Sequence, residues 1–158
     1  MNPPAILFVC LGNICRSPLA EAAFRAAAAE AQFECIVDSA GTGNWHRGSP
    51  PDRRAQSVAH AHGMTIGHYQ ARQVCADDFG AFNHIVAMDS NNLANLRSLA
   101  PHDSRASLSL LLDHVAGRES QSVADPYEGD MEDFHRCWET VTLGASALLQ
   151  SLRQQHRV

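Results

Sequence analysis

The sequence predicts an α/β fold, a three-layer sandwich in which helices cover both faces of a four-stranded parallel sheet. Strand-like and helix-like segments alternate along the chain, which is the order that gives βαβ units and parallel strands. The first strand candidate, Ala5–Cys10, is an uninterrupted apolar run, typical of a strand that is buried on both faces. The length of 158 residues, with no internal repeat or linker, favours a single domain over residues 1–158.

The other elements follow in chain order. Further strands are expected at residues 35–39, 84–88 and 108–112, and helices at 19–31, 52–62 and 93–99. Ser17 and Pro18 are typical of an N-cap and a first helical position. The last helix should bury a stripe with steps of three and four residues, namely Met131, Phe134, Trp138, Val141, Ala145, Leu148 and Leu152. Cys137 and Trp138 fit that stripe as core residues, whereas residues 113–129 form a long loop of the kind that is often functional.

Composition excludes several functions. The net charge of -5 argues against a nucleic-acid-binding surface. All 12 basic residues are arginine, so neither a Walker A phosphate loop nor Schiff-base chemistry is available. No apolar run is long enough to span a membrane, and no basic segment precedes the first strand as in a signal peptide.

The five cysteines indicate a reducing compartment. An odd number with no C-x-x-C pair argues against a disulfide scaffold. No Cys/His cluster has the spacing of a zinc site, so we expect no metal and no cofactor. We therefore expect a cytoplasmic protein.

The turn after the first strand carries the main chemical signal. It reads Cys-Leu-Gly-Asn-Ile-Cys-Arg-Ser-Pro over residues 10–18 and leads directly into a helix. Such a turn can point successive N–H groups inward to form an anion site at the helix N-terminus. Gly12 permits close backbone approach, and Arg16 offers a planar fork to two phosphate oxygens. The predicted phosphate-binding residues are Leu11, Gly12, Asn13, Ile14, Cys15 and Ser17.

Cys10 would face the bound anion as a thiolate. The same N–H groups favour the charged sulfur, which could attack phosphorus in line while Arg16 stabilises the equatorial oxygens. Ser17 is near enough in sequence to donate a hydrogen bond to the sulfur. A cysteine at the end of a buried strand can also be a plain packing residue, and Leu11 and Ile14 can be packing residues or the apolar rim of a pocket.

This turn resembles the phosphate loop of the low-molecular-weight protein tyrosine phosphatases. The similarity continues along the chain in the family's order, through residues 38–45, 51–55, His68 with residues 71–73, residues 88–89 and Asp125-Pro-Tyr127. The resemblance implies hydrolysis of phosphotyrosine, in a protein or a small aryl phosphate, through a cysteinyl-phosphate intermediate. The enzyme would be a monomer or weak dimer.

The resemblance also implies roles for individual residues. Asp125 would be the general acid, although an Asp-Pro pair can also serve only as a turn or as a cap for the final helix. Trp45 and Tyr127 would wall the slot for the phenyl ring, or else be partly buried loop residues. Asn13, Ser39 and His68 would brace the phosphate loop by hydrogen bonds.

Two positions, Glu128 and Cys15, leave substrate preference and redox regulation open. Glu128 stands where many relatives have a second aromatic residue, so substrate preference cannot be copied from them. Cys15 could form a reversible disulfide with an oxidised Cys10, as the resemblance supports, or be a buried spectator thiol.

A competing function is arsenate reduction on the same scaffold. Such reductases share the first turn but relay oxidation through a closely spaced downstream cysteine pair. Cys75 and Cys137 are 62 residues apart, and Asp125-Pro-Tyr127 favours cleavage of a phosphate ester. A non-catalytic phosphate-binding module would be expected to lack Cys10, Arg16 or Asp125.

Overall fold

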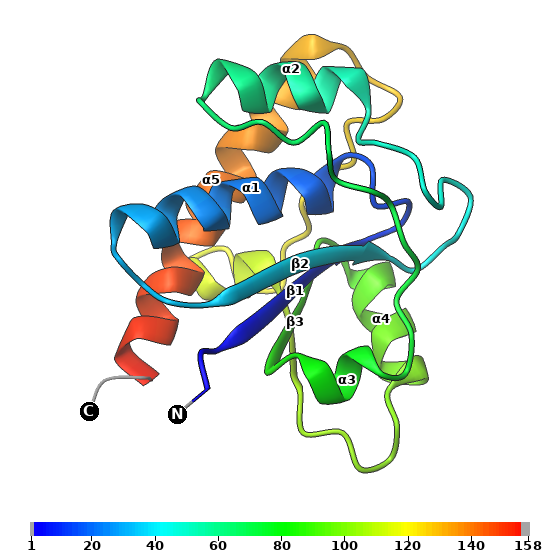
Figure 1. Ribbon diagram of the computed structural model, residues 1–158, viewed down its shortest axis with the longest axis vertical. Coiled ribbons are helices and arrows are strands. Elements are labelled where there is room, and N and C mark those ends of the chain that lie inside the picture. Colours follow the sequence, from blue (N-terminus) through cyan, green and yellow to red (C-terminus); the bar gives the residue numbers. More distant parts are fainter. Residues whose placement is uncertain (1, 156–158) are drawn as a thin grey trace.

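A computed structural model describes residues 2–155, which contain a four-stranded, wholly parallel sheet in the order β2-β1-β3-β4. Figure 1 labels three of these strands, β1, β2 and β3. The strands are β1 (Ala5–Cys10), β2 (Ile36–Gly41), β3 (His84–Ala87) and β4 (Ser107–Leu110). The chain leaves β1 toward β2 and then returns to the other side of β1 for β3. Open parallel sheets bind ligands at the carboxyl ends of strands beside such a reversal.

Helices cover both faces of this sheet (Figure 1), which confirms the predicted three-layer architecture. One face carries α1 (Arg16–Glu30), α2 (Arg53–Ala61) and α5 (Met131–Gln155), and the other carries α3 (Asp78–Ala81) and α4 (Ser90–Leu99). Successive side chains of β1 point to opposite faces of the sheet. Phe8 packs in the core that includes α1, α2 and α5, and Leu7 packs in the core that includes α3 and α4. Both side chains are fully buried, as the apolar run predicted.

Three local predictions were wrong or incomplete. Helix α1 begins at Arg16, and its N-cap is Cys15 rather than Ser17, because the Ser17 hydroxyl is hydrogen-bonded inside the preceding turn. The expected strand at 108–112 ends at Leu110 and continues as a 3-10 helix, Leu111–His114. The short helix α3 was not predicted, since four residues are too few to show a periodic pattern.

The last helix follows the predicted stripe. Its buried residues include Phe134, Cys137 and Trp138, while Met131 at its start is exposed. Within residues 2–155 we find no helix that combines the length and apolarity needed to cross a bilayer.

Gly144 lets α5 approach the 3-10 segment closely. A Cβ atom there would lie 2.5 Å from Cγ of Leu111, and Leu111 is completely buried. The leucine therefore has no room to retreat.

We expect Gly144→Ala to lower the free energy of unfolding by about 1–2 kcal/mol, because overpacking exceeds the gain in helix propensity. Urea denaturation measures this change. Gly80→Ala is the matched control, since Gly80 is also helical and a Cβ there meets nothing within 4 Å. A Gly144→Ala protein as stable as the Gly80→Ala protein would contradict the close-packing account.

Candidate active site

The turn between β1 and α1 directs its carbonyl groups outward. The Leu11 carbonyl accepts from the Gly43 N–H at 2.9 Å, and the Ile14 carbonyl accepts from the Asp52 N–H at 2.9 Å. Among residues 2–155 we find no protein acceptor for four N–H groups of the same turn, those of Leu11, Gly12, Ile14 and Cys15. Backbone N–H groups arranged in this way form a concave site for an anion.

The sulfur of Cys10 lies at the start of this turn and is almost completely buried. The backbone N–H of Asn13 donates to Cys10 Sγ at 3.3 Å. Ser17 Oγ lies 3.0 Å from the same sulfur, as the sequence predicted. Donors at these positions stabilise a thiolate.

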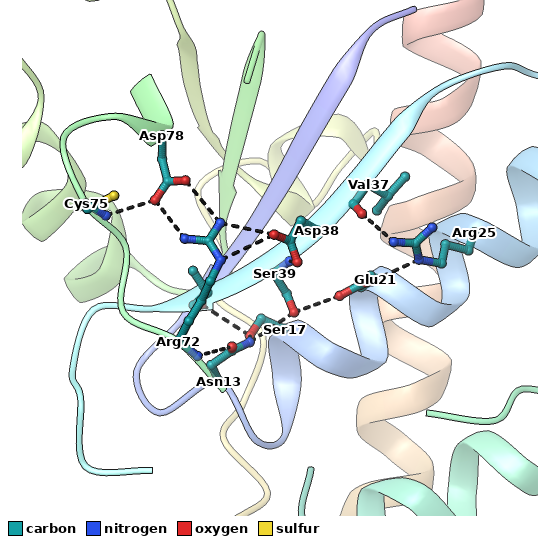
Figure 2. A network of polar contacts seen from close by, with 11 residues as sticks. Asn13, Ser17, Glu21, Arg25, Val37, Asp38, Ser39, Arg72, Cys75 and Asp78 are labelled. Atoms are coloured by element: carbon teal, nitrogen blue, oxygen red, sulfur yellow. Dashed lines mark hydrogen bonds and ion pairs between the residues drawn. The ribbon is translucent and has the colours of Figure 1, made fainter. Parts of the chain in front are cut away.

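Asn13 gives the turn its curvature, because its φ of 58° lies in the left-handed region. Its side-chain amide holds that conformation through three hydrogen bonds (Figure 2): Nδ2 donates to Ser17 Oγ at 2.8 Å and to Ser39 Oγ at 3.0 Å, and Oδ1 accepts from the Arg72 N–H at 3.1 Å. Asparagine tolerates this region better than most residues. The contacts of Asn13 and Ser39 are those expected of bracing residues.

Gly41 at the end of β2 allows the turn to pass close by. A Cβ atom at this position would lie 2.6 Å from the Leu11 carbonyl oxygen and 3.2 Å from the Asn13 nitrogen. Both neighbours are backbone atoms of the turn itself. Any larger side chain at Gly41 would therefore displace the turn.

The bracing predicted for His68 is not found in the structure. His68 is exposed, and its ring makes an edge contact with Tyr69 at a centroid distance of 4.9 Å. The third bond to Asn13 comes instead from the backbone of Arg72. The Arg72 guanidinium is held by ion pairs to Asp38 at 3.2 Å and to Asp78 at 3.0 Å (Figure 2).

A buried carboxyl group completes the bracing on the α1 side. Ser39 Oγ donates to Glu21 Oε1 at 2.8 Å, and Arg25 Nε donates to Glu21 Oε2 at 2.9 Å (Figure 2). Burial raises the pKa of Glu21, and the hydrogen bonds from Ser39 and Arg25 only partly oppose it. No sequence motif identified Glu21, which reads as an ordinary helix residue one turn after Ser17.

Arg16 is buried at the first position of α1 and reaches across to the strand ends. Its Nη1 donates to Asp89 Oδ2 at 2.7 Å and to the Val123 carbonyl at 3.1 Å. Asp89 follows β3 and is the N-cap of α4. These contacts fix the guanidinium beside the turn, where its second nitrogen lies 3.5 Å from Asp125 Oδ2.

Asp125 lies in the long loop before α5 and has a partly exposed side chain. Its Oδ1 accepts from the Tyr127 N–H at 3.1 Å. Arg54 holds the same loop by donating to the Tyr127 carbonyl at 3.0 Å and to the Gly129 carbonyl at 2.8 Å. Asp52, the N-cap of α2, pairs with Arg54 at 2.9 Å, so the acid-bearing loop and the turn are tied to one helix end.

A cavity of about 140 Å³ brings these parts together. Its lining includes the predicted residues Cys10, Leu11, Gly12, Ile14, Cys15, Arg16, Trp45, Asp125 and Tyr127. His46 also lines it, with its ring 6.3 Å from that of Tyr127. Sequence reasoning assigned no role to His46, which follows Trp45, or to Arg54, which lies inside the segment 51–55 that carried part of the resemblance.

Comparison with known proteins agrees with this geometry. Residues 5–158 match the family described as low molecular weight phosphotyrosine protein phosphatase. A phosphatase of that name from Schizosaccharomyces pombe is 45% identical over 137 residues, covering 84% of this chain and 86% of its own. The low-molecular-weight protein-tyrosine-phosphatase YfkJ of Bacillus subtilis is 38% identical over 98% of this chain and 99% of its own. The chain belongs to the low-molecular-weight phosphotyrosine protein phosphatase family.

Solved structures show the same fold. The crystal structure of YfkJ superposes with a TM-score of 0.91 over 99% of both chains. A Drosophila arginine phosphatase, 31% identical, superposes with a TM-score of 0.89 over 94% of this chain and 97% of its own. The protein is thus an enzyme of the protein-tyrosine-phosphatase class on an α/β scaffold shared across the family.

Burial disfavours the ionised form of two other thiols of this phosphatase, those of Cys15 and Cys137. All five cysteines are unpaired. Burial raises the pKa of Cys15 far above its ordinary value, and it raises that of Cys137 to about 12. Across residues 2–155, no group of three or more His, Cys, Asp or Glu side chains is arranged to hold a metal ion.

We expect Glu21 to contribute a component of stability that decreases as pH rises. A carboxyl group whose pKa is raised in the folded state binds more protons there than in the unfolded chain, so its contribution falls from its ordinary pKa of about 4.3 up through the raised value. A glutamine at this position does not titrate. The free energy of unfolding of the wild type should therefore fall relative to that of Glu21→Gln as pH rises over this range. Urea titrations at a series of pH values measure it, and a constant or opposite difference would contradict the burial account.

Proposed function

We propose that this phosphatase hydrolyses phosphotyrosine through a phosphate ester of Cys10. The observation that carries the proposal is the convergence on one cavity of a sulfur that accepts a hydrogen bond from the Asn13 N–H, a buried guanidinium and a carboxyl group. In this proposal Cys10 is the nucleophile, Arg16 stabilises the transferring phosphoryl group, and Asp125 is the general acid.

The first step forms the sulfur–phosphorus bond. The Cys10 thiolate attacks phosphorus opposite the tyrosyl oxygen, and the phosphorus–oxygen bond breaks. The electron pair of that bond leaves with the tyrosyl oxygen, which takes the proton of Asp125. The N–H groups of the turn and Arg16 bind the equatorial oxygens, whose charge must be stabilised in the transition state.

The second step releases phosphate. The Asp125 carboxylate accepts a proton from a water molecule as that water attacks phosphorus. The sulfur–phosphorus bond breaks, its electron pair restores the Cys10 thiolate, and Asp125 is again protonated. All the groups come from one chain and none requires a cofactor, so a monomer is sufficient.

The walls of the cavity favour an aromatic ester. Trp45 and Tyr127 stand on its rim with exposed rings, and Leu11 and Ile14 line it. A phenyl ring can reach between such walls, whereas the shorter side chain of phosphoserine would leave them uncovered. Tyrosine phosphate, in a protein or as a small aryl phosphate, is therefore the proposed substrate.

Oxidation could stop the reaction reversibly. Cys10 and Cys15 both line the cavity. If a peroxide converts Cys10 to a sulfenic acid, the Cys15 thiol can displace water from it to form a disulfide, which protects Cys10 from further oxidation. This role, and the five unpaired thiols, support a location in the reducing cytoplasm.

Arsenate reduction is less well supported. Cys75 is exposed beside α3, and Cys137 is buried in α5 with a pKa raised to about 12. Neither thiol lines the cavity that contains Cys10, so neither is placed to relay oxidation from Cys10 as Cys15 is.

Cys10→Ser should abolish hydrolysis of phosphotyrosine while inorganic phosphate still binds, because the turn and Arg16 remain. Steady-state assays with phosphotyrosine, phosphoserine, phosphoarginine and arsenate, together with phosphate titration by calorimetry, measure both properties. We expect the wild type to prefer phosphotyrosine. Undiminished hydrolysis by Cys10→Ser would contradict the covalent route, and a preference for another of these compounds would contradict the proposed substrate.

Asp125→Asn should slow the first step by about 10²–10⁴-fold for phenyl phosphates whose leaving group is weakly acidic. The loss should be much smaller for strongly acidic phenols, whose oxygen leaves without a proton. A series of substituted aryl phosphates measures this dependence. An equal loss across the series would show that Asp125 is not the proton donor.

A further inference from the structure

A second hollow adjoins the catalytic cavity. It encloses about 310 Å³, and its lining includes Leu11, Thr42, Trp45, Asn95, Ser98 and Leu99. Leu11 and Trp45 also line the catalytic cavity, so these two side chains form the wall between the two hollows. We call the second hollow the α4 groove, because Asn95, Ser98 and Leu99 belong to α4.

Exposed apolar side chains gather at these two hollows. Seven large apolar side chains are exposed among residues 2–155, and four of them line one hollow or both: Leu11, Trp45, Leu99 and Tyr127. Single exposed apolar residues are ordinary. A contiguous group of them beside a reactive site marks a surface that binds a partner.

Trp45 is supported in its exposed position. Its side chain is packed so tightly on Gly43 that a Cβ atom there would lie 1.9 Å from the indole, yet 70% of the residue remains accessible. The Gly43 N–H is bonded to the Leu11 carbonyl of the phosphate-binding turn at 2.9 Å. The Trp45 side of the wall between the hollows thus rests on a residue that is hydrogen-bonded to the catalytic turn.

The absence of charged residues in the lining of the α4 groove favours an uncharged ligand group. None of its lining residues carries a charge, whereas the catalytic cavity contains Asp125 and Arg16. A peptide whose phosphotyrosine enters the catalytic cavity must continue over the surface next to it. In an extended peptide, side chains two residues apart point to the same side. Because the two hollows share Leu11 and Trp45, a side chain two residues from the phosphotyrosine can face the α4 groove.

We propose that the α4 groove binds an uncharged apolar side chain of the substrate, two residues from the phosphotyrosine. This specificity site rests on the proposed function. The groove supplies affinity through Leu99 and the outer face of Trp45, and it takes no part in the chemistry. The substrate class is thereby narrowed to phosphotyrosine peptides with a leucine-like residue near the phosphorylated tyrosine.

Peptide hydrolysis tests this proposal. Phosphopeptides on one alanine-rich background carry Leu or the similarly sized, uncharged Asn at the second position before or after the phosphotyrosine. The wild type should hydrolyse one Leu peptide with a kcat/KM about tenfold above that of its Asn counterpart, mainly through KM. Leu99→Asp should remove this preference and leave the hydrolysis of p-nitrophenyl phosphate within about twofold of the wild type, since that ester has no flanking residue.

Leu143→Asp is the matched control. Leu143 is exposed to 45%, close to the 47% of Leu99, but it lies on α5 and lines neither hollow. It should keep the peptide preference. An unchanged preference in Leu99→Asp, or none in the wild type, would overturn the groove proposal while hydrolysis of p-nitrophenyl phosphate still supports the phosphatase reaction.

Two further outcomes would also decide against the proposal. If the wild type does not hydrolyse p-nitrophenyl phosphate, the proposed function fails and the groove proposal fails with it. If sedimentation shows a dimer that Leu99→Asp dissociates without any change in peptide preference, the α4 groove binds a second copy of the chain instead of substrate.

Discussion

The left-handed conformation of Asn13 is the constraint on which the site depends. It turns one backbone N–H toward the Cys10 sulfur, and it curves the turn so that its carbonyls point outward. A residue held in this region costs about 1–3 kcal/mol unless its surroundings compensate. Here the compensation comes from three hydrogen bonds of the Asn13 side chain, which donates to Ser17 and Ser39 and accepts from the backbone N–H of Arg72. The turn that holds Cys10 is therefore braced by residues from three separate segments, α1, β2 and the loop that contains Arg72.

The bracing spreads from the turn into the scaffold. Ser39 connects Asn13 with the buried Glu21 on α1, and Arg72 connects it with the acidic residues Asp38 and Asp78 (Figure 2). On the other side of the cavity, the pair of Asp52 and Arg54 ties the Asp125 loop to the N-terminus of α2. The proposed nucleophile, Cys10, and the proposed general acid, Asp125, come from segments that are 115 residues apart in the sequence. The sheet and two helix ends set their separation before any substrate arrives, as preorganised catalysis requires.

Much of this could be predicted from the sequence because the signals are local. The apolar run of Ala5–Cys10 specifies a buried strand, and the spacing from Cys10 to Arg16 specifies a tight turn before a helix. Arg54, His46 and Glu21 could not be found in that way, because each acts through contacts with residues far away in the chain or through its placement beside a cavity. His68 was assigned a bracing role by resemblance alone, and the backbone of Arg72 fills that position instead. Ser17 was read as an N-cap because its type fits one, but its hydroxyl is used by the Cys10 sulfur and by Asn13.

Acid quenching during steady turnover tests the central proposal most directly. Wild-type protein mixed with phosphotyrosine is denatured within milliseconds, digested, and analysed by mass spectrometry for a phosphoryl group on the peptide that contains Cys10. The account predicts that a single phosphoryl group is attached to the Cys10 sulfur, that it disappears when substrate is exhausted, and that it is absent from Cys10→Ser. Normal turnover with no phosphorylated Cys10 at any time, or with the phosphoryl group on another residue, would contradict it.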